Sequence, residues 1–259
     1  MSLPLGGRTA VVTGVSRRRG IGFAVASRLA SMGASLAVHH HLPHDSDEYG
    51  AADDLSELLA DLRASLRGSA RLCDLPGDLG DADTAEGLIP AVRGMLGHVD
   101  VLVCNHAHGG DAVGLADLTS TALDRHWAVN TRGTLLLTKA LAAQHDGRPG
   151  GRVIWMTSGQ ALGPMSDNVA YVASKAALAG TTWSVANELI DHGILLNTIN
   201  PGPVNTGYLD DAPPAVLEAF PRHRLGEPQD PARLIAWLVS DDGEWVVGQV
   251  LNAEGGFRR

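Results

Sequence analysis

The chain of 259 residues contains little cysteine, few aromatic residues and fewer basic than acidic groups. Its two cysteines, Cys73 and Cys104, both lie in apolar, strand-like runs, which argues against a disulfide framework and for a reducing compartment. Aromatic residues make up 4%, which argues against an aromatic-rich binding surface. The net charge is −9, so the clustered cations that neutralise nucleic-acid phosphates are not expected. No segment approaches the roughly 18 uncharged apolar residues of a membrane span, and residues 1–7 lack the basic and apolar regions of a signal peptide. We therefore expect a cytoplasmic protein whose partners include neither nucleic acid nor a membrane.

The chain does contain enough apolar material, 44%, for a sizeable core, and 31 glycines for tight turns. Short apolar runs alternate with helical patterns along the whole sequence, and this alternation predicts an α/β fold. The runs expected to form strands are residues 8–13, 35–41, 70–79, 99–104, 151–158, 194–199 and 248–251. We predict a single domain over residues 1–259, built on a Rossmann-type doubly wound parallel sheet of about seven strands with helices on both faces.

Four features interrupt this regular pattern. Residues 44–50 are polar and acidic, and we expect a loop outside the core. Pro90 lies within the helical pattern 81–96 and predicts a kink or a late start. Residues 204–227 are proline-rich, and we expect a substrate loop with one short helical stretch. Asn130 has apolar neighbours inside the long helix expected over 119–144, so its amide needs partners. It would either bridge helix turns or hold a water near the active site.

A glycine-rich loop follows the first expected strand and precedes an alanine-rich helix. Strand, glycine loop and helix in this order point backbone N–H groups and a helix N-terminus at a phosphate. Small residues are needed where the pyrophosphate of a dinucleotide approaches the backbone. The residues concerned are Gly14, Ser16, Gly20, Ile21 and Gly22. A glycine-rich turn alone is often only a turn, but this position in the chain favours phosphate binding.

The end of the second expected strand indicates which dinucleotide would bind. An acidic side chain there would bind the 2′-hydroxyl of the adenosine ribose. Positions 39–41 are instead three histidines, of which His40 is expected to face the ribose. With the arginines of the glycine loop, where Arg17 and Arg19 are the candidate ligands, this favours a 2′-phosphate and hence NADP(H), with NAD(H) as second choice. The alternative is a solvated arginine run beside a histidine-rich strand end, and no metal site is expected because consecutive histidines face opposite sides of a strand.

Tyr171 and Lys175 are four residues apart and lie on one face of an expected helix. A phenol has a pKa of about 10, but a nearby ammonium lowers that pKa and makes proton transfer with a carbonyl oxygen feasible. Ser158 precedes Tyr171 by thirteen residues, so a strand end and a turn can bring its hydroxyl beside the phenol. By itself the spacing is also typical of an exposed surface pair.

Together these pieces resemble the short-chain dehydrogenase/reductase family over nearly the whole chain, and most of all its 3-oxoacyl-(acyl carrier protein)-reductase-like branch. The matching pieces come in the order of the family: the glycine loop, Asp78-Leu79, Asn105-His106-Ala107, Asn130, Ser158, Tyr171 with Lys175, and Pro201-Gly202 before Thr206. The resemblance implies an oxidoreductase that transfers hydride between a nicotinamide and a ketone or secondary alcohol. It also implies a homo-oligomer, a tetramer or a dimer.

The resemblance assigns a role to each matching residue. Tyr171 would be the general acid in reduction and the base in oxidation, while Lys175 would lower its pKa and bind the nicotinamide ribose. Ser158 would bind the substrate oxygen, and Asn130 would anchor a water in a proton relay through Lys175. The residues implied to hold the cofactor are Gly14, Ser16, Gly20, Ile21 and Gly22 at the pyrophosphate, Asp78 and Leu79 at the adenine, Asn105, His106 and Ala107 after the fourth strand, and Pro201, Gly202, Val204 and Thr206 at the nicotinamide.

Three features depart from the family pattern. Five residues separate Gly14 from Gly20 where the family has three, so this loop must bulge. His106 and His108 place bulky groups after the fourth strand, and His108 either reaches the substrate side or is structural. Residues 39–50 are longer and more polar than usual, as expected for a flap over the adenosine end.

Two other functions stay open on the sequence. One is an NAD-dependent alcohol dehydrogenase of the same family. The other is a non-catalytic dinucleotide-binding sensor or structural subunit, against which the retained Tyr171, Lys175 and Ser158 argue. The small-molecule carbonyl substrate is not specified, because loops diverge freely on one scaffold. Apolar residues within 204–227 suit an acyl chain, a polyketide or a ring.

Overall fold

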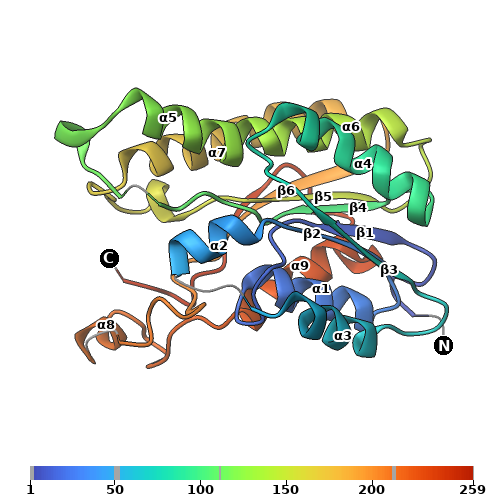
Figure 1. The fold of residues 1–259 in the computed structure, drawn as a ribbon, viewed down its shortest axis with the longest axis horizontal. Helices are drawn as coiled ribbons and strands as arrows, with labels where there is room; N and C mark the ends of the chain where they lie inside the picture. Colours follow the sequence, from blue (N-terminus) through green and yellow to red (C-terminus); the bar gives the residue numbers. More distant parts are fainter. Residues whose placement is uncertain (1–2, 50–52, 111, 212–213, 259) are drawn as a thin grey trace.

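Seven parallel strands form one sheet at the centre of the molecule (Figure 1). The computed structural model describes residues 3–49, 53–110, 112–211 and 214–258. The strands are β1 Thr9–Val12, β2 Ser35–His40, β3 Leu72–Pro76, β4 Val101–Cys104, β5 Gly151–Met156, β6 Ile194–Asn200 and β7 Val250–Asn252. Their order across the sheet is β3-β2-β1-β4-β5-β6-β7, and neighbours pair in parallel. The expected doubly wound sheet is confirmed.

Helices cover both faces of this sheet. In Figure 1, α4 to α7 lie above it, and α1, α3 and α9 lie below it. The helices are α1 Ile21–Ser31, α2 Leu42–Tyr49, α3 Leu55–Ser65, α4 Ala82–Leu96, α5 Ser120–His126, α6 Thr134–Gln144, α7 Val169–Ile190, α8 Pro214–Glu218 and α9 Gln229–Val239. Short single turns occur at Leu115–Asp117, Gly159–Ala161 and Asp241–Gly243.

The sheet separates two apolar cores, because strands such as β1, β4 and β5 are buried along their whole length. Fully buried leucines and isoleucines hold each core together, and each contributes about 1.5–3 kcal/mol. Examples are Leu29, Leu58 and Ile235 on one side of the sheet, and Ile89, Leu141 and Leu178 on the other. Trp155 on β5 is fully buried in the second core, where its indole Nε1–H donates to Thr138 Oγ1 at 3.0 Å.

The long helix expected over residues 119–144 is present, but it is not uniform. Between α5 and α6 the chain forms a π-helical segment, Trp127–Gly133, with Asn130 near its middle. Such wide turns are rare, and they occur often at functional sites.

One local expectation is wrong, and one of two alternatives is excluded. Residues 44–49 are not a loop but part of α2, because Pro43 suits a first helical turn and Asp45 there complements the helix dipole. α2 lacks an apolar stripe, so periodicity gives no helical signal. Of the two effects expected of Pro90, the late start is excluded, because α4 begins at Ala82, directly after Asp81, whose side chain accepts a hydrogen bond from the Thr84 N–H at 2.8 Å. The kink stays a prediction. The expectation for residue 50 lies outside the described residues.

The expected substrate loop is closed at its base. Val204 pairs with Gly226 in an isolated parallel bridge, so the two ends of this segment lie side by side. Between them the short α8 is the one helical stretch of the described part, as expected. Figure 1 places this segment at the lower left, beyond the ends of the strands and below the α5 end of the upper layer.

Candidate active site

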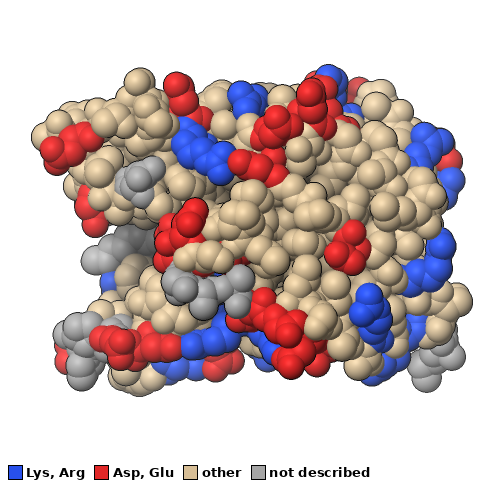
Figure 2. All heavy atoms as spheres, viewed as in Figure 1, with Lys and Arg blue, Asp and Glu red and all other residues tan. Residues whose placement is uncertain are grey.

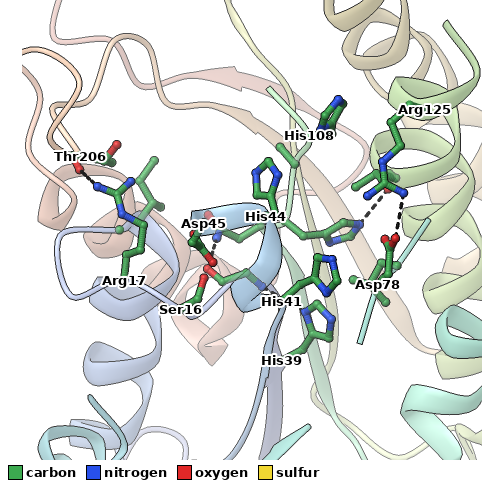
Figure 3. Close-up of a pocket in the computed structure, with 18 residues that line it drawn as sticks. Ser16, Arg17, His39, His41, His44, Asp45, Asp78, His108, Arg125 and Thr206 are labelled. Atoms are coloured by element: carbon green, nitrogen blue, oxygen red, sulfur yellow. Dashed lines mark hydrogen bonds and ion pairs between the residues drawn. The ribbon is translucent and has the colours of Figure 1, made fainter. Parts of the chain in front are cut away.

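A crevice opens at the carboxyl ends of β1 and β4, where the strand order reverses. This is the place where open α/β sheets bind ligands. The cavity has a volume of about 220 Å³ (Figure 3). Its lining includes the following expected cofactor residues: Gly14, Ser16, Arg17, Gly20, Ile21, Asp78, Leu79, Asn105, His106, Ala107 and Thr206. These residues come from distant parts of the chain and meet at one edge of the sheet.

The glycine loop forms a close-packed cradle on this edge. A methyl group on Gly22 would lie 2.4 Å from the Gly14 carbonyl oxygen, so only glycine fits there. The Asn105 side chain donates to the carbonyls of Thr13 and Gly14, both at 3.1 Å, and thereby fixes the start of the loop. α1 begins at Ile21 without a side-chain cap and without an acidic residue in its first turn. Its N–H groups and dipole therefore suit an anionic pyrophosphate.

Thr13 and His106 join the ends of β1 and β4 beneath this cradle. Thr13 Oγ1 accepts hydrogen bonds from the N–H groups of Asn105 and His106, at 3.0 and 3.2 Å. His106 Nδ1 lies 2.7 Å from the same hydroxyl, and its Nε2 lies 3.0 Å from the carbonyl of Val129. Because a carbonyl only accepts, Nε2 carries the proton and Nδ1 accepts from Thr13. Burial lowers the pKa of His106 to about 3, so this histidine is a neutral structural bridge.

The arginines of the glycine loop go to three different places. Arg17 lines the crevice and donates to the carbonyl of Thr206 at 2.7 Å. Arg18 bonds the acidic side chains of α3, Glu57 and Asp61. Arg19 lies outside the crevice lining, on Asp210 of the substrate loop. Of the two expected phosphate ligands, only Arg17 borders the crevice.

The second strand presents different histidines from the expected one. His39 and His41 line the crevice, whereas the His40 side chain turns away toward Asp74 on β3, with Nε2 at 3.3 Å from its carboxylate. The expected ribose contact of His40 is therefore corrected to its neighbours, because alternate side chains of a strand face opposite sides. Burial lowers the pKa of His39 to about 4, so His39 contributes a neutral ring to the crevice.

Helix α2 lies over the crevice in the place where a flap was expected. Its His44 and Asp45 face the cavity, and Figure 3 shows Asp45 beside Ser16. Asp45 is only 5% exposed. The far end of α2 reaches the loop after β4, where a methyl group on Gly110 would lie 2.9 Å from Glu48 Oε2. A buried carboxylate thus borders the same crevice as the glycine loop.

The opposite end of the crevice is closed by an ion pair. Arg125 on α5 donates to Asp78 at 2.9 Å, and both residues line the cavity (Figure 3). Asp78 also accepts from the Gly80 N–H at 2.8 Å. Desolvation opposes these two contacts, but their net effect is a lowered pKa of Asp78, which stays ionised at neutral pH.

Tyr171 and Lys175 lie on one face of α7, beside the end of β5. Lys175 Nζ is 5.8 Å from the centre of the Tyr171 ring and donates to the carbonyl of Met156 at 3.0 Å. Lys175 is 2% exposed, and this burial lowers its pKa to about 8. The pair is therefore an internal one, and the surface alternative left open by the spacing does not apply.

Ser158 follows the end of β5 and begins the single turn Gly159–Ala161. The preceding Thr157 donates its hydroxyl to the Lys175 carbonyl at 2.9 Å, which pins this strand end to α7. Ser158 is half-buried at that junction. The structure thus brings the expected serine to the same strand–helix junction as the Tyr171 and Lys175 pair.

Asn130 holds the loop after β4 against α7. Its side-chain oxygen accepts from the His108 N–H at 2.7 Å, and its Nδ2 donates to the His108 carbonyl at 3.1 Å and to Ser174 Oγ at 2.9 Å. Asn130 is fully buried, so these contacts offset the cost of burying its amide. The side chain therefore bridges the loop after β4 and α7 rather than turns of its own helix, and its role toward a water stays a prediction.

Three histidine rings lead from α2 to the tyrosine. The ring centres of His44 and His108 are 5.7 Å apart, those of His108 and His126 4.6 Å, and those of His126 and Tyr171 6.3 Å. His126 is fully buried, and its Nδ1 lies 2.9 Å from the Ala122 carbonyl. His108 lines the crevice, and His126 lies between it and Tyr171.

The remaining expected residues lie beyond the crevice lining. Gly202 has a φ of 66° and packs against Glu254, and Val204 is buried beside Gly226. Pro201 borders a second cavity, also about 220 Å³, together with Phe220 and Arg222. These positions continue from the end of β6 toward the substrate loop.

Sequence reasoning missed His41, Asp45 and Arg125 as crevice residues. Arg125 lies on α5, 47 residues from its partner Asp78, and no local pattern indicates that contact. Asp45 lies in a segment expected to be a loop. The run of histidines was a usable signal, but the sequence alone did not show which of them face inward.

The fold and the site together define a dinucleotide-binding oxidoreductase, and comparisons with known proteins agree. A family model described as enoyl-(acyl carrier protein) reductase matches residues 14–258. The chain is 35% identical over 255 residues to the uncharacterized oxidoreductase YjdA of Bacillus subtilis (strain 168), with 97% of each chain covered. The chain belongs to the short-chain dehydrogenase/reductase family.

Solved structures show the same relationship. A short-chain dehydrogenase from Burkholderia cenocepacia J2315 in complex with NADP is 30% identical, with a TM-score of 0.84 and 98% of each chain covered. The promiscuous reductase LugOII, which catalyses keto-reduction at C1 during lugdunomycin biosynthesis, is 32% identical, with a TM-score of 0.82 and 98% of each chain covered.

Other classes of site find no support in the described residues. Each helix in those ranges is too short or too polar to cross a membrane. Within the same ranges, no group of three or more histidine, cysteine and acidic side chains is arranged to hold a metal ion. On the face shown in Figure 2, acidic and basic side chains are interspersed.

Proposed function

We propose that this protein is an NADP(H)-dependent carbonyl reductase that reduces a ketone to a secondary alcohol, or oxidises the matching alcohol. The observation that carries the proposal is the Tyr171–Lys175 pair, with Lys175 Nζ buried 5.8 Å from the phenol ring beside the end of β5. LugOII is a reductase of a keto group, which supports a ketone as the substrate class. The domain spans residues 1–259, with 204–227 as the substrate loop.

The cradle fits the anionic part of a dinucleotide. The glycines that leave no room for a Cβ and the uncapped start of α1 would hold the pyrophosphate. Asp78 and Leu79 would flank the adenine, and Arg17 would meet the 2′-phosphate. Pro201, Gly202, Val204 and Thr206 would border the nicotinamide. When bound, the nicotinamide supplies or accepts the hydride.

The protein's own groups handle the proton. Tyr171 would donate its phenolic proton to the substrate oxygen during reduction and remove it during oxidation. The Lys175 ammonium favours the phenolate that remains, because an opposite charge close by stabilises the ionised form. Ser158 would donate a hydrogen bond to the same oxygen, and such positioned donors stabilise the charge that develops there.

Two observations make NAD(H) the second candidate. His39 is neutral and adds no positive charge for a 2′-phosphate, and Asp45 is a carboxylate that could accept hydrogen bonds from ribose hydroxyls. NADP in the Burkholderia cenocepacia structure and Arg17 in the lining favour NADP(H). Fluorescence titrations with NADPH and NADH decide between them, and a clear preference for NADH contradicts the first choice.

The catalytic assignment is tested with Tyr171→Phe. We expect this variant to bind NADPH like the parent and to lose nearly all reduction of ketones, because phenylalanine keeps the ring without the proton. Cyclic ketones, quinones and 3-oxoacyl thioesters form the substrate panel. Turnover at the parent rate would show that Tyr171 is not the acid.

The cytoplasmic location and homo-oligomeric assembly remain predictions.

A further inference from the structure

The lengthened glycine loop crosses to the substrate loop and is bonded to it at two points. Arg17 Nη2 donates to the Thr206 carbonyl at 2.7 Å. Arg19 forms a two-pronged pair with Asp210, in which Nη1 and Nη2 each lie 2.5 Å from one carboxylate oxygen. Arg19 and Asp210 are 191 residues apart in sequence. The glycine loop has five residues between Gly14 and Gly20, and this extra length lets Arg17 and Arg19 reach the substrate loop.

The substrate loop is shaped to receive these arginines. Asn205 Nδ2 donates to Asp210 Oδ1 at 2.9 Å, while its oxygen accepts from the N–H groups of Gly207 and Leu209, at 2.9 and 3.3 Å. Gly207 has a φ of 120°, and a methyl group there would lie 3.1 Å from Arg17 Nη2. One asparagine thus folds the turn and also orients the carboxylate that binds Arg19.

The pair adds little to the stability of the fold. The side chains of Arg19 and Asp210 are 55% and 47% exposed, and exposed ion pairs are worth about 0–1 kcal/mol. The Arg19–Asp210 pair matters instead for the two segments that it joins. It joins the phosphate-binding side of the crevice to the segment that follows the expected nicotinamide residues Pro201 and Gly202.

We propose that Arg19 and Asp210 are positioning residues that hold residues 205–210 of the substrate loop against the glycine loop, and that Arg19 is not a ligand of the cofactor 2′-phosphate. This inference rests on the proposed function, because it concerns how that reaction's substrate is held. A loop fixed in its closed geometry orients the substrate before reaction, which lowers KM and favours turnover. Arg17, in contrast, borders the crevice.

The test compares Arg19→Ala and Asp210→Asn with the parent enzyme. We expect the KM for the best ketone to rise about three- to tenfold in each variant, since a two-pronged charged pair is stronger than a simple surface pair. The Kd for NADPH should stay within about twofold. Arg148→Ala is the matched control, because Arg148 forms a similar exposed, two-pronged pair with Asp146 outside the crevice. The control should change neither constant.

Reversal of the pair provides a second measurement. Arg19→Asp alone places two carboxylates together and should raise the KM further, whereas the double variant Arg19→Asp/Asp210→Arg should recover at least half of the loss. No recovery would overturn the proposal. A weaker affinity of Arg19→Ala for NADPH with an unchanged affinity for NADH would also overturn it, because that result identifies a 2′-phosphate ligand.

Hydrogen exchange separates this inference from the proposed function. The amides of Gly207 and Leu209 are bonded to Asn205, so their exchange reports whether the turn is held, and no substrate is needed. In Arg19→Ala we expect both amides to exchange at least about threefold faster, with Arg148→Ala like the parent. If no ketone is reduced, the proposed function fails while this comparison still decides whether the pair holds the loop. Unchanged exchange would contradict the proposal.

Discussion

Lys175 Nζ lies 5.8 Å from the centre of the Tyr171 ring and 3.0 Å from the Met156 carbonyl, with almost no exposure to solvent. Burial lowers the pKa of this lysine from 10.5 to about 8, so the charged ammonium destabilises the folded protein. The shift corresponds to about 3 kcal/mol at pH 7, where the lysine is charged in both the folded and unfolded states. The site thus keeps a destabilising charge next to the residue proposed to transfer the proton.

Lys175→Met should therefore separate stability from activity. We expect the free energy of unfolding at pH 7 to rise by about 1–3 kcal/mol, because methionine fills a similar volume without a buried charge. Reduction of ketones should fall to near background. Urea denaturation and steady-state kinetics measure the two effects. Lys139→Met is the control, because Lys139 pairs with Glu86 on the surface and its loss should change stability by less than about 0.5 kcal/mol. A destabilised Lys175→Met protein would contradict this account.

The same lowered pKa predicts a pH limit for reduction. Since burial puts the pKa of Lys175 at about 8, the ammonium fraction in the free enzyme falls as the pH rises through 8. The ratio kcat/KM reports ionisations of the free enzyme. We expect it to fall about tenfold per pH unit above that value. Stability changes in the opposite sense, because between pH 8 and 10.5 the unfolded chain binds the proton more tightly, so unfolding becomes harder as the pH rises. A flat rate profile up to pH 10 would show that the charge is not required.

Much of the fold and the pairing of Tyr171 with Lys175 could be predicted from the sequence because the signals are local. Buried parallel strands are continuous apolar runs, and the spacing of Tyr171 and Lys175 fixes their common helical face. The family resemblance then supplied the order of the pieces. The sequence also showed that five residues separate Gly14 from Gly20, and hence that this loop must bulge.

The direction of that bulge could not be predicted, because it depends on partners far away in the chain. Arg19 meets Asp210, and nothing near either residue indicates the other. The prediction placed His40 at the ribose, but in the structure His39 lines the crevice and His40 lies on the opposite face of the strand. Alternation along a strand separates two faces, but it does not tell which face borders the crevice. α2 was missed because its polar residues show no helical stripe, and the helix is positioned by contacts such as His44 with His108.

Buried neutral histidines predict acid sensitivity. Burial lowers the pKa of His106 to about 3 and that of His39 to about 4, both below the usual 6.5. Below pH 6.5 the unfolded chain takes up protons that the folded protein refuses, so stability is lost as the pH falls toward 4. Each histidine lowers the free energy of unfolding by about 1.4 kcal/mol per pH unit, so the two together lower it by nearly twice that amount.

His106→Asn should remove about half of this slope between pH 6 and 4.5, measured by urea denaturation at each pH. The variant should also be less stable at pH 7, because the bridge from Thr13 to the Val129 carbonyl is lost. His192→Asn, at an exposed position, should leave the slope unchanged. An unchanged slope in His106→Asn would mean that His106 is not held neutral in the fold.

Asp45 places a buried carboxylate beside the glycine loop that is proposed to hold the pyrophosphate, and this relationship predicts tighter cofactor binding when the charge is removed. Asp45 lines the same crevice as Gly14 and Ser16, so a pyrophosphate bound there would lie near its carboxylate. Asp45→Asn removes the repulsion and should lower the Kd for NADPH about three- to tenfold, with a smaller effect on NADH, which has fewer charges. Asp47→Asn, exposed on the same helix, removes an equal charge and should change the Kd by less than about twofold. If Asp45→Asn instead weakens NADH binding, the carboxylate binds the ribose hydroxyls, and NAD(H) becomes the preferred cofactor.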